Sequence, residues 1–325
     1  MNLIYAVLPI AAGFLLDCII GDPYWLFHPI RLIGSLISAL EKAVRRLFGR
    51  HLRLGGSALA AVVLLLSTGV PAAMLFFLYG LNFWLGIAAE SIMCFYCIAA
   101  KCLKTESMKV CASLEKNDIE QARKAVSMIV GRDTKSLDEA GITRAAVETV
   151  AENASDGVCA PLFYMALGGA VGAFFYKAAN TMDSMIAYKN EKYGDIGFAA
   201  AKIDDILNFV PSRLCALLMI ISSGILRLDM KNAAKIWRRD RRKHSSPNSA
   251  QTESVCAGAL GLRLGGDAYY FGELHKKQFI GDELREIEPR DIRRANDLMY
   301  AASGIMLIIA AAFRAVAVIV LCGIS

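Results

Sequence analysis

Long apolar stretches, separated by polar loops, constrain the fold of this 325-residue chain more than any other feature. Residues 2–20, 57–79, 81–100 and 300–322 each approach the ~20 residues that an α-helix needs to cross a bilayer. The sequence is 56% hydrophobic, above the ~45–50% that is usual for soluble domains. Because backbone polar groups must be satisfied internally in lipid, helices are the expected spanning element. We therefore predict an all-α integral membrane protein with about four full spans.

Two further apolar segments, 158–178 and 206–226, are nearly long enough to span. If only one of them crossed, the basic run at 238–243 would lie outside the cell, against the positive-inside tendency. Both segments therefore cross, or neither does. Gly168-Gly169 interrupts the first segment and Pro211 opens the second, so we expect re-entrant or broken helices. Such helices would bring the neighbouring polar residues together near the membrane surface.

The basic residues indicate the orientation of the chain. Cations at 45–53 and 101–104 follow apolar segments, and we expect both positions to be cytoplasmic. The chain is then a single multi-pass domain, 1–325, with cytoplasmic helical loops at 104–156 and 227–297. This placement accounts for the net charge of +6, so we expect the lipid bilayer of the cell (inner) membrane as a partner, and no nucleic acid. A homo-oligomer is left open.

Local patterns predict structure outside the spans. One face of the segment after Pro29 carries the apolar side chains of Leu32, Ile33, Leu36, Ile37 and Leu40, which is typical of an interfacial helix. Asn117, followed three residues later by Glu120, predicts a helix N-cap. Asp17, near the end of the first apolar run, is expected to reach the interface. Residues 275–290 are expected to form a charged linker.

Carboxylates, carboxamides and cations crowd residues 152–213, beside apolar runs where charge is expensive and usually functional. Oxygen ligands suited to Mg²⁺ come from Asn180, Asp183, Asp204 and Asp205. Cations suited to the phosphates of a substrate come from Lys177, Lys189, Lys202 and Arg213. Ion pairs that only hold a helix bundle together would give the same composition, and that alternative stays open.

Two more polar sites lie at the start of that stretch and after it. A helix predicted over 137–154 places Glu148 and Glu152 on one face, and Asn153 and Asp156 follow at its end. This pattern indicates a functional helix end, although a solvated face would look similar.

Ser246-Pro247-Asn248-Ser249 ahead of Glu253 predicts a helix N-terminus, whose N–H groups suit an anion. A plain helix cap is equally compatible. His28 is suited to acid–base chemistry or to a structural role in the loop. The chain has no Gly-x-x-x-x-Gly-Lys-Ser/Thr loop, which argues against a standard P-loop ATPase.

In order along nearly the whole chain, these motifs resemble the CobD/CbiB family of membrane adenosylcobinamide-phosphate synthases. The resemblance is carried by Gly21-Asp22-Pro23, His28 to Gly34, Glu152-Asn153, Asp156-Gly157, Tyr176-Lys177, Asn180 to Met185, Lys202, Asp204-Asp205, Pro211, Arg213, Ser246 to Ser249, Glu253 and Ala257 to Ala259. Ala187 and Ala250 depart from the family pattern, which more often has Gly; both are small, so the departures change little.

The resemblance implies an enzyme that forms an amide between adenosylcobyric acid and (R)-1-aminopropan-2-ol phosphate or the free amino alcohol. A carboxylate does not condense with an amine unaided, so we expect activation by ATP and Mg²⁺. The catalytic positions implied are Glu152, Asp156, Asp183 and Lys177. The substrate- or phosphate-binding positions implied are His28, Arg31, Asn153, Asn180, Lys202, Arg213, Ser246, Asn248 and Glu253, and the metal ligands are Asp183, Asp204 and Asp205.

Two other classes of protein share parts of this pattern. A Mg²⁺-dependent membrane prenyltransferase also places Asp clusters at helix ends, but it needs two equivalent Asp-rich motifs and only Asp204-Asp205 comes close. A transporter also uses broken helices and intramembrane charge, but it is expected to show two related halves, which the hydropathy of this chain does not.

Overall fold

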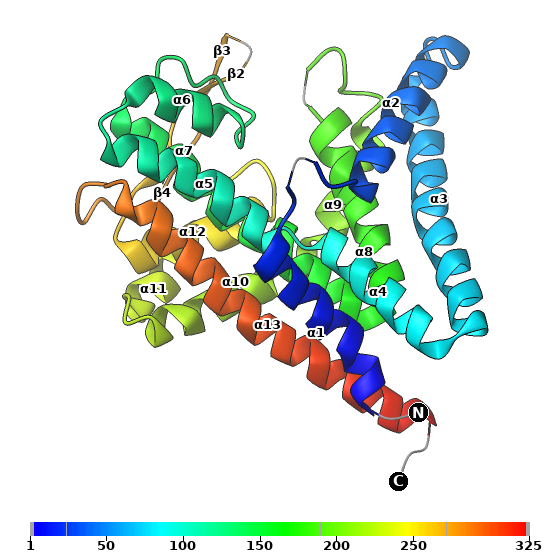
Figure 1. The fold of residues 1–325 in the computed structure, drawn as a ribbon. Helices are drawn as coiled ribbons and strands as arrows, with labels where there is room; N and C mark the ends of the chain where they lie inside the picture. The colour runs from blue at the N-terminus through cyan, green and yellow to red at the C-terminus, as the bar shows by residue number, and fades with distance from the viewer. Residues whose placement is uncertain (1–2, 24, 189, 271, 323–325) are drawn as a thin grey trace. The chain divides into compact units, whose positions relative to one another are not determined.

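The computed structural model describes residues 3–23, 25–188, 190–270 and 272–322, and these are mostly helical (Figure 1). They divide into two compact units. The first comprises Met1–Ala99, Ala160–Asn208 and Leu307–Ser325, and the second comprises Ala100–Cys159 and Phe209–Met306.

Helices are the regular secondary structure of the first unit, and no strand lies among its described residues. Its helices are α1 (Leu3–Ile20), α2 (Pro29–Leu47), α3 (Leu52–Leu81), α4 (Phe83–Cys97), α8 (Ala160–Ile186), α9 (Phe198–Leu207) and the later part of α13 (Arg290–Cys322). Helix α1 packs along α4, and α3 packs against α8 (Figure 1).

The second unit combines helices with four very short strands. Its elements are α5 (Ala100–Glu115), α6 (Ile119–Ser127), α7 (Glu139–Asn153), the π-helix η1 (Ala154–Cys159), α10 (Phe209–Ile225), α11 (Met230–Asp240), α12 (Ser249–Leu260), β1 (Leu264–Gly265), β2 (Ala268–Tyr270), β3 (Glu273–His275), β4 (Phe279–Ile280) and the start of α13. Strand β1 pairs with β4 and β2 pairs with β3, both antiparallel.

Within the described residues, four helical stretches are long and apolar enough to cross a membrane. They are Leu52–Leu81, Phe83–Glu115, Glu139–Ile186 and Arg290–Val320. Helices α9 and α10 pass the same test only as a bent pair, as a broken span or a re-entrant loop would. This confirms an all-α multi-pass membrane protein in which 158–178 and 206–226 are spanning or broken helices.

The first predicted apolar run forms helix α1. Within its described residues the apolar stretch Tyr5–Ile20 is shorter than the four stretches above, and whether α1 crosses the membrane stays a prediction. Asp17 does not reach the surface, because its side chain is fully buried within the unit.

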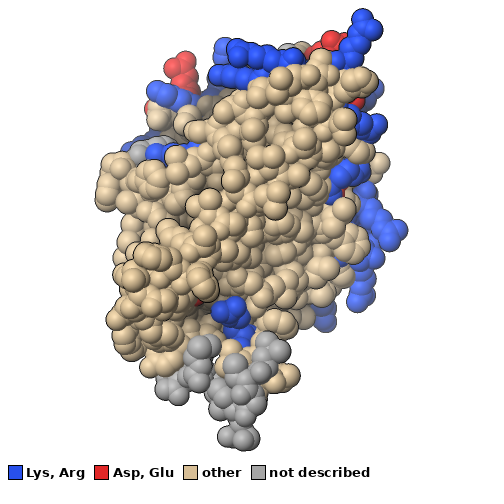
Figure 2. All heavy atoms as spheres, turned by 90° about the vertical axis from the view of Figure 1, so that its right-hand side faces the viewer, with Lys and Arg blue, Asp and Glu red and all other residues tan. Residues whose placement is uncertain are grey.

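Helix α3 presents a broad apolar face. Figure 2 looks onto the side of the molecule where α3 lies and shows a wide surface almost without charged side chains, with Lys and Arg along its upper and right-hand edges. The exposed side chains of α3 include Leu65, Val70, Phe76 and Phe77. Such a surface is stable beside lipid tails and unfavourable in water.

Helix α8 is broken at Gly168-Gly169. Gly169 has φ +60° and ψ −150°, a conformation that is essentially restricted to glycine. The break frees the backbone N–H of Ala170, which donates to Glu90 Oε1 on α4 at 3.3 Å. Tyr79 on α3 donates to the other carboxylate oxygen, Oε2, at 2.6 Å. Glu90 therefore satisfies backbone that the break leaves open, as apolar surroundings require.

Helix α12 forms the centre of the second unit, since all of its residues are buried. It packs closely on α11 at Gly258, where an added Cβ would lie 2.7 Å from Ala233 Cα. Asn232 on α11 donates to the carbonyl of Gly258 at 2.8 Å, which closes the same contact.

The polar loops contain more defined structure than their sequences predict. Helix α6 is capped by Asp118, which accepts from Gln121 N–H at 2.9 Å, and not by Asn117. The backbone of Asn117 has φ +59°, so this residue ends the turn before the helix and leaves the cap to its neighbour.

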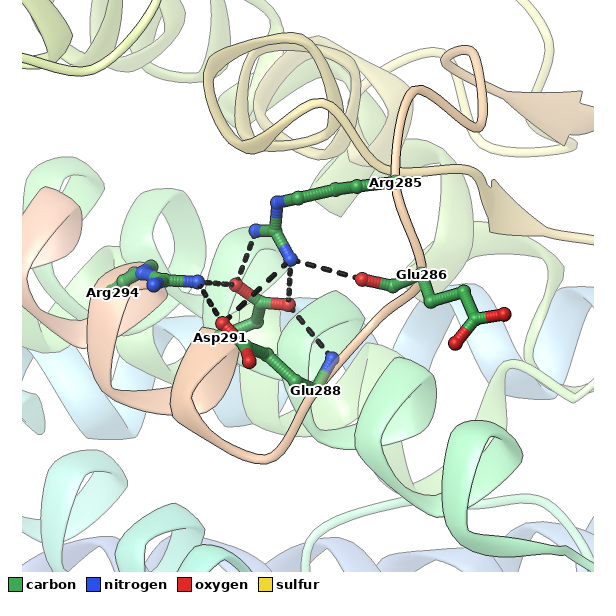
Figure 3. A network of polar contacts seen from close by, with 5 residues as sticks. All are labelled: Arg285, Glu286, Glu288, Asp291 and Arg294. Carbon is green, nitrogen blue, oxygen red and sulfur yellow. Dashed lines mark hydrogen bonds and ion pairs between the residues drawn. The ribbon is translucent and has the colours of Figure 1, made fainter.

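The segment predicted as a charged linker is anchored at both ends. Near its start lie strands β3 and β4. At its end, the buried carboxylate of Asp291 accepts two bonds from Arg285, at 2.5 and 2.9 Å, and one from Arg294 at 2.8 Å (Figure 3). The N–H of Glu288 adds a fourth bond at 3.0 Å and fixes the first turn of α13.

A second buried carboxylate, Asp240, holds α11 to the loop after β4. Both oxygens of Asp240 accept from Arg239 at 2.8 Å, Lys243 lies 2.7 Å from Oδ1, and Gly281 N–H donates at 2.8 Å. Burial opposes ionisation of Asp240, but the bonds from Arg239, Lys243 and Gly281 outweigh it and lower its pKa to about 2.

We predict that Gly169→Ala lowers the thermal unfolding temperature in detergent far more than Gly168→Ala. A Cβ on Gly169 would lie 2.3 Å from Glu90 Oε1 in a strained conformation, whereas a Cβ on Gly168 would meet nothing within 4 Å. We expect a loss of at least ~1–3 kcal/mol for Gly169→Ala, from backbone strain alone. Equal melting temperatures for the two variants would contradict the role of this break.

We predict that Asp240→Asn destabilises the protein by ~1–3 kcal/mol, because it removes the charge from a fully buried side chain that accepts from Arg239, Lys243 and Gly281. The Arg239 and Lys243 side chains are 41% and 33% exposed, so water recovers part of the loss. Asp282→Asn is the matched control: its exposed carboxylate binds the same Arg239 at 2.8 Å, and its loss should change stability by ~0–1 kcal/mol. Chemical unfolding in detergent measures both.

The carboxylate of Asp240 also makes the stability of the protein depend on pH. Because the pKa of Asp240 is lower in the folded protein than its ordinary value of 3.8, its stabilising effect is complete above that value. The effect is lost as the pH falls from about 4 toward 2. The stability difference between wild type and Asp240→Asn should therefore shrink over this range; a constant difference would contradict the assignment.

Candidate functional site

One face of α8 carries three of the predicted site residues. Lys177, Asn180 and Asp183 follow one another at intervals of three, which places them on the same side of the helix. All three are partly exposed. Lys189, also predicted to bind phosphate, lies outside the residues that the structure describes. Asn180 Nδ2 donates to Asp204 Oδ1 on α9 at 3.3 Å, so the structure brings these two predicted ligands together.

The two adjacent carboxylates of α9 have different surroundings. Asp204 is 8% exposed and faces Asn180 on α8. Asp205 lies 3.8 Å from Lys202 Nζ in a pair within one helix, and the Lys202 side chain is 61% exposed. An exposed pair of this kind contributes little to stability. Lys202 can therefore move toward a bound anion at small energetic cost.

The predicted metal ligands do not form a cluster by themselves. Among the described residues, no group of three His, Cys, Asp or Glu side chains is arranged to hold a metal ion. Mg²⁺ commonly takes one or two carboxylates and completes its shell with water and substrate phosphates. Asp204 and Asp183 are compatible with that mode, in which substrate supplies the remaining oxygens. The magnesium site stays a prediction.

His28 acts as the N-cap of α2. Its Nδ1 accepts from Ile30 N–H at 3.3 Å, and its Nε2 lies 3.2 Å from Asp22 Oδ1. The ring packs edge-on against Tyr96. Both ring nitrogens are thus engaged, which gives His28 a structural role whatever it contacts in a complex.

Arg31, one turn into α2, borders an open groove of about 760 Å³. The groove also receives Lys42, Arg46 and Met185. Its three basic side chains suit an anionic group on a large ligand.

A stacked pair of tyrosines, Tyr176 and Tyr164, supports the polar face of the first unit, and neither was assigned a role from sequence. Tyr176, next to Lys177, donates through its hydroxyl to Asn208 Oδ1 at 2.8 Å. Its ring stacks on Tyr164 with centroids 5.0 Å apart, and Tyr164 donates to the carbonyl of Leu207 at 2.9 Å. These contacts join α8 to the end of α9 and so fix the position of Asp204.

In the second unit, the end of α7 meets the start of α12. Glu152 Oε1 accepts from the hydroxyl of Ser249 at 2.7 Å. Asn153 donates to the carbonyl of Thr149 at 3.0 Å, within its own helix. Asp156 follows on the π-helix η1, a distortion that is rare and often found at functional sites.

Arg213 is joined to the turn before α12. Its guanidinium donates to Asn248 Oδ1 at 3.0 Å and to the carbonyl of Pro247 at 3.3 Å, and it stacks on Phe209. Ser246 Oγ accepts from Asn248 N–H at 3.2 Å. Three residues predicted from separate motifs, Arg213, Ser246 and Asn248, therefore form one network at the N-terminus of α12.

Glu253, one turn further along α12, lies beside two other carboxylates. Burial, followed by the proximity of Glu152 and Glu148, raises the pKa of Glu253 well above its ordinary value. Glu148 is neutralised by an ion pair with Arg132 and also accepts from Gly265 N–H at 2.6 Å. Arg132 and Gly265 were missed from sequence, because neither belongs to a motif with an evident chemical role.

Each unit thus contains its own polar set. The first unit offers carboxylates, a carboxamide and mobile cations, which suit metal-bound phosphates. The second offers an arginine at a helix N-terminus and a buried carboxyl of raised pKa, which suit an anion and a group that exchanges protons.

Comparison with known proteins identifies the relatives of this chain. A family model described as "CobD/Cbib protein" matches residues 10–299. A "Cobalamin biosynthesis protein CobD" of Clostridium perfringens is 48% identical over 310 residues, covering 95% of this chain and 98% of the relative. A protein of the same name from Klebsiella pneumoniae is 46% identical over 297 residues, covering 91% and 93%.

The "Cobalamin biosynthesis protein CbiB" of Salmonella typhimurium is 44% identical over 315 residues, covering 96% of this chain and 97% of the relative. No solved structure matches the chain.

Proposed function

Because the chain belongs to the CobD/CbiB family, we propose that it is an amide-forming ligase of cobalamin biosynthesis, an adenosylcobinamide-phosphate synthase. It joins adenosylcobyric acid to (R)-1-aminopropan-2-ol phosphate, or to the free amino alcohol. The names of its relatives support the role in cobalamin biosynthesis. The assignment of the amide-forming reaction is supported by hydrogen bonds between residues of separate family motifs. Asn180 bonds to Asp204, and Arg213 bonds to Asn248.

The proposed reaction activates the corrin carboxylate with ATP. A carboxylate oxygen attacks the terminal phosphorus, ADP leaves, and an acyl phosphate results. The amine nitrogen then attacks the acyl carbon, phosphate leaves, and the nitrogen loses a proton. Both steps transfer negative charge onto phosphoryl oxygens, so fixed cations and hydrogen-bond donors lower their barriers.

Residues of the first unit are assigned to the phosphoryl groups. Asp183, with Asp204 and Asp205, would hold Mg²⁺, which would neutralise phosphate charge. Lys177 and Lys202 would bind phosphoryl oxygens, and the exposed pair of Lys202 with Asp205 leaves that lysine able to do so. Asn180 orients Asp204 through its 3.3 Å hydrogen bond.

Residues of the second unit are assigned to the amine and to an anion. Glu152 or Asp156 would bind the ammonium or accept its proton, and the 2.7 Å bond from Ser249 holds Glu152 in place. Arg213, already oriented by Asn248 and Phe209, would add a fixed positive charge.

One assay tests both the ligase activity and its dependence on ATP. Detergent-purified protein is given adenosylcobyric acid, aminopropanol phosphate and Mg²⁺, with and without ATP. ATP-dependent amide formation is the expected result. Amide formation without ATP would contradict phosphoryl activation, and the absence of product under both conditions would contradict the ligase.

We predict that Asp183→Asn abolishes amide formation in this assay, with a loss of at least ~100-fold. The substitution removes a negative charge from the proposed metal ligand with little change in shape. Asp195→Asn, in the exposed loop before α9, is the matched control and should keep wild-type turnover. Near-normal turnover of Asp183→Asn would exclude the metal role of this residue.

A further inference from the structure

The second unit contains a pocket that the motifs do not describe as a whole. It has a volume of about 280 Å³ and is bordered by the loop before α7, the turn after α11, helix α12 and the segment around β4. Six of the side chains that border it carry most of its charge: Arg132, Arg242, Lys243, Lys276, Glu148 and Glu253.

Positive charge dominates one side of the pocket. Arg132 is neutralised by Glu148, and Lys243 is held by Asp240 at 2.7 Å. Arg242 and Lys276 form no ion pair with any residue that the structure describes, and both are exposed. Lys277 also borders the pocket and donates to the hydroxyl of Tyr270 at 2.7 Å. This side therefore keeps positive charge that an anion can neutralise.

Glu253 places a carboxyl group on the buried side of the pocket. The other polar side chains of the first two turns of α12 are satisfied: Ser249 donates to Glu152, Gln251 accepts from Trp237, and Thr252 and Ser254 donate to backbone carbonyls. The carboxyl of Glu253, only 6% exposed, receives no hydrogen bond from any described residue.

A buried carboxyl without a partner is costly, by ~1–3 kcal/mol. The free energy is recovered if a ligand brings a hydrogen-bond donor, and recovered best by a cation. The carboxyls of Glu148 and Glu152 reinforce this preference, because both lie near Glu253 and neither can donate a proton while ionised.

We propose that this pocket binds a small molecule that carries both a phosphate and an amine. The phosphate contacts Arg242 and Lys276, and the ammonium contacts the carboxylate of Glu253. The volume of the pocket limits the size of the ligand. Pockets for drug-sized ligands have volumes of ~300 to 1,000 Å³, and this one is slightly smaller. A phosphorylated amino alcohol fits in about 280 Å³, and a corrinoid does not.

The identity of that molecule as aminopropanol phosphate rests on the proposed function. The preference for a phosphorylated amine rests only on the charged side chains that line the pocket. Glu253, previously grouped with the phosphate-binding positions, becomes the partner of the amine. Binding without a corrinoid or ATP follows, because the pocket lies within one unit.

The test is calorimetric titration of the detergent-purified full chain with three probes: aminopropanol phosphate, free aminopropanol and inorganic phosphate. We expect the phosphorylated amine to bind more tightly than either half. Arg242→Ala and Lys276→Ala should each weaken its binding about 10-fold or more, as the loss of a charged hydrogen bond does. Lys231→Ala, an exposed lysine of α11 outside the pocket, should leave binding unchanged.

Glu253→Gln gives the more selective readout. It should weaken the binding of aminopropanol phosphate about 10-fold or more while inorganic phosphate binds as in wild type, which also shows that the variant is folded. Equal loss for both probes, or no loss for either, would overturn the role of Glu253.

The two proposals fail in different ways. If wild type forms the amide but Arg242→Ala and Lys276→Ala bind the phosphorylated amine normally, the pocket assignment is wrong and the ligase remains. If the phosphorylated amine binds with the expected losses in the variants and no amide is formed, the pocket is supported and the ligase is wrong.

Discussion

The fold of the first unit depends on the buried carboxylate of Glu90, which accepts a hydrogen bond from a backbone N–H that the break in α8 leaves unpaired. Helix α8 carries the polar face of Lys177, Asn180 and Asp183, and it is interrupted at Gly168-Gly169 within an apolar segment. An unpaired N–H in such surroundings would cost several kcal/mol. Glu90 removes that cost by accepting from Ala170, and Tyr79 holds Glu90 in place.

Arg314 completes the neutralisation of this region. Its guanidinium lies near the break, since a Cβ on Gly169 would be 3.7 Å from Nη1, and its Nε donates to the carbonyl of Ala6 at 3.3 Å. A charged residue inside an apolar helix is expected to face the bundle interior and to pair, and both Glu90 and Arg314 follow that rule. The polar face of α8 therefore depends on the hydrogen bonds of Glu90, which lie among apolar side chains.

The second unit also buries polar groups, and many of them lie on one helix, α12. Ser249 and Gln251 of α12 bond to Glu152 on α7 and Trp237 on α11, which ties α12 to its neighbours. Thr252 and Ser254 donate to backbone carbonyls of α12 itself. Polar networks in a core are favourable when every member is satisfied. Glu253 is the exception on this helix, and it lies where the unit has a pocket. An exception of this kind is more informative about function than the satisfied residues around it.

Hydropathy and glycine placement predicted most of the fold. Residues 57–79, 81–100 and 300–322 lie in helices long enough to span, and Gly168-Gly169 marks a real break, because these features depend on local sequence alone. The burial of Asp17 and the cap at Asp118 could not be predicted, since they depend on tertiary packing and on a backbone turn.

Part of the site was also within reach of sequence. The pairs Asn180–Asp204 and Arg213–Asn248 join residues that separate motifs had named. Glu90 was missed although a lone acid inside an apolar run is a recognisable signal, and Arg314 inside the last span is its basic counterpart. Arg132, Arg242 and Lys276 were missed because loops far apart in the chain bring them to one pocket, and no local pattern records that.

The central claim, that the corrin carboxylate is activated by phosphoryl transfer, is tested most directly by following an oxygen isotope. Adenosylcobyric acid labelled with ¹⁸O in its free carboxylate is converted with ATP, Mg²⁺ and aminopropanol phosphate, and the released phosphate is analysed by mass spectrometry or ³¹P NMR. The account predicts that one labelled oxygen per turnover appears in inorganic phosphate, because the acyl–oxygen bond of the acyl phosphate breaks. Label in AMP, or no label in any phosphate product, would contradict it.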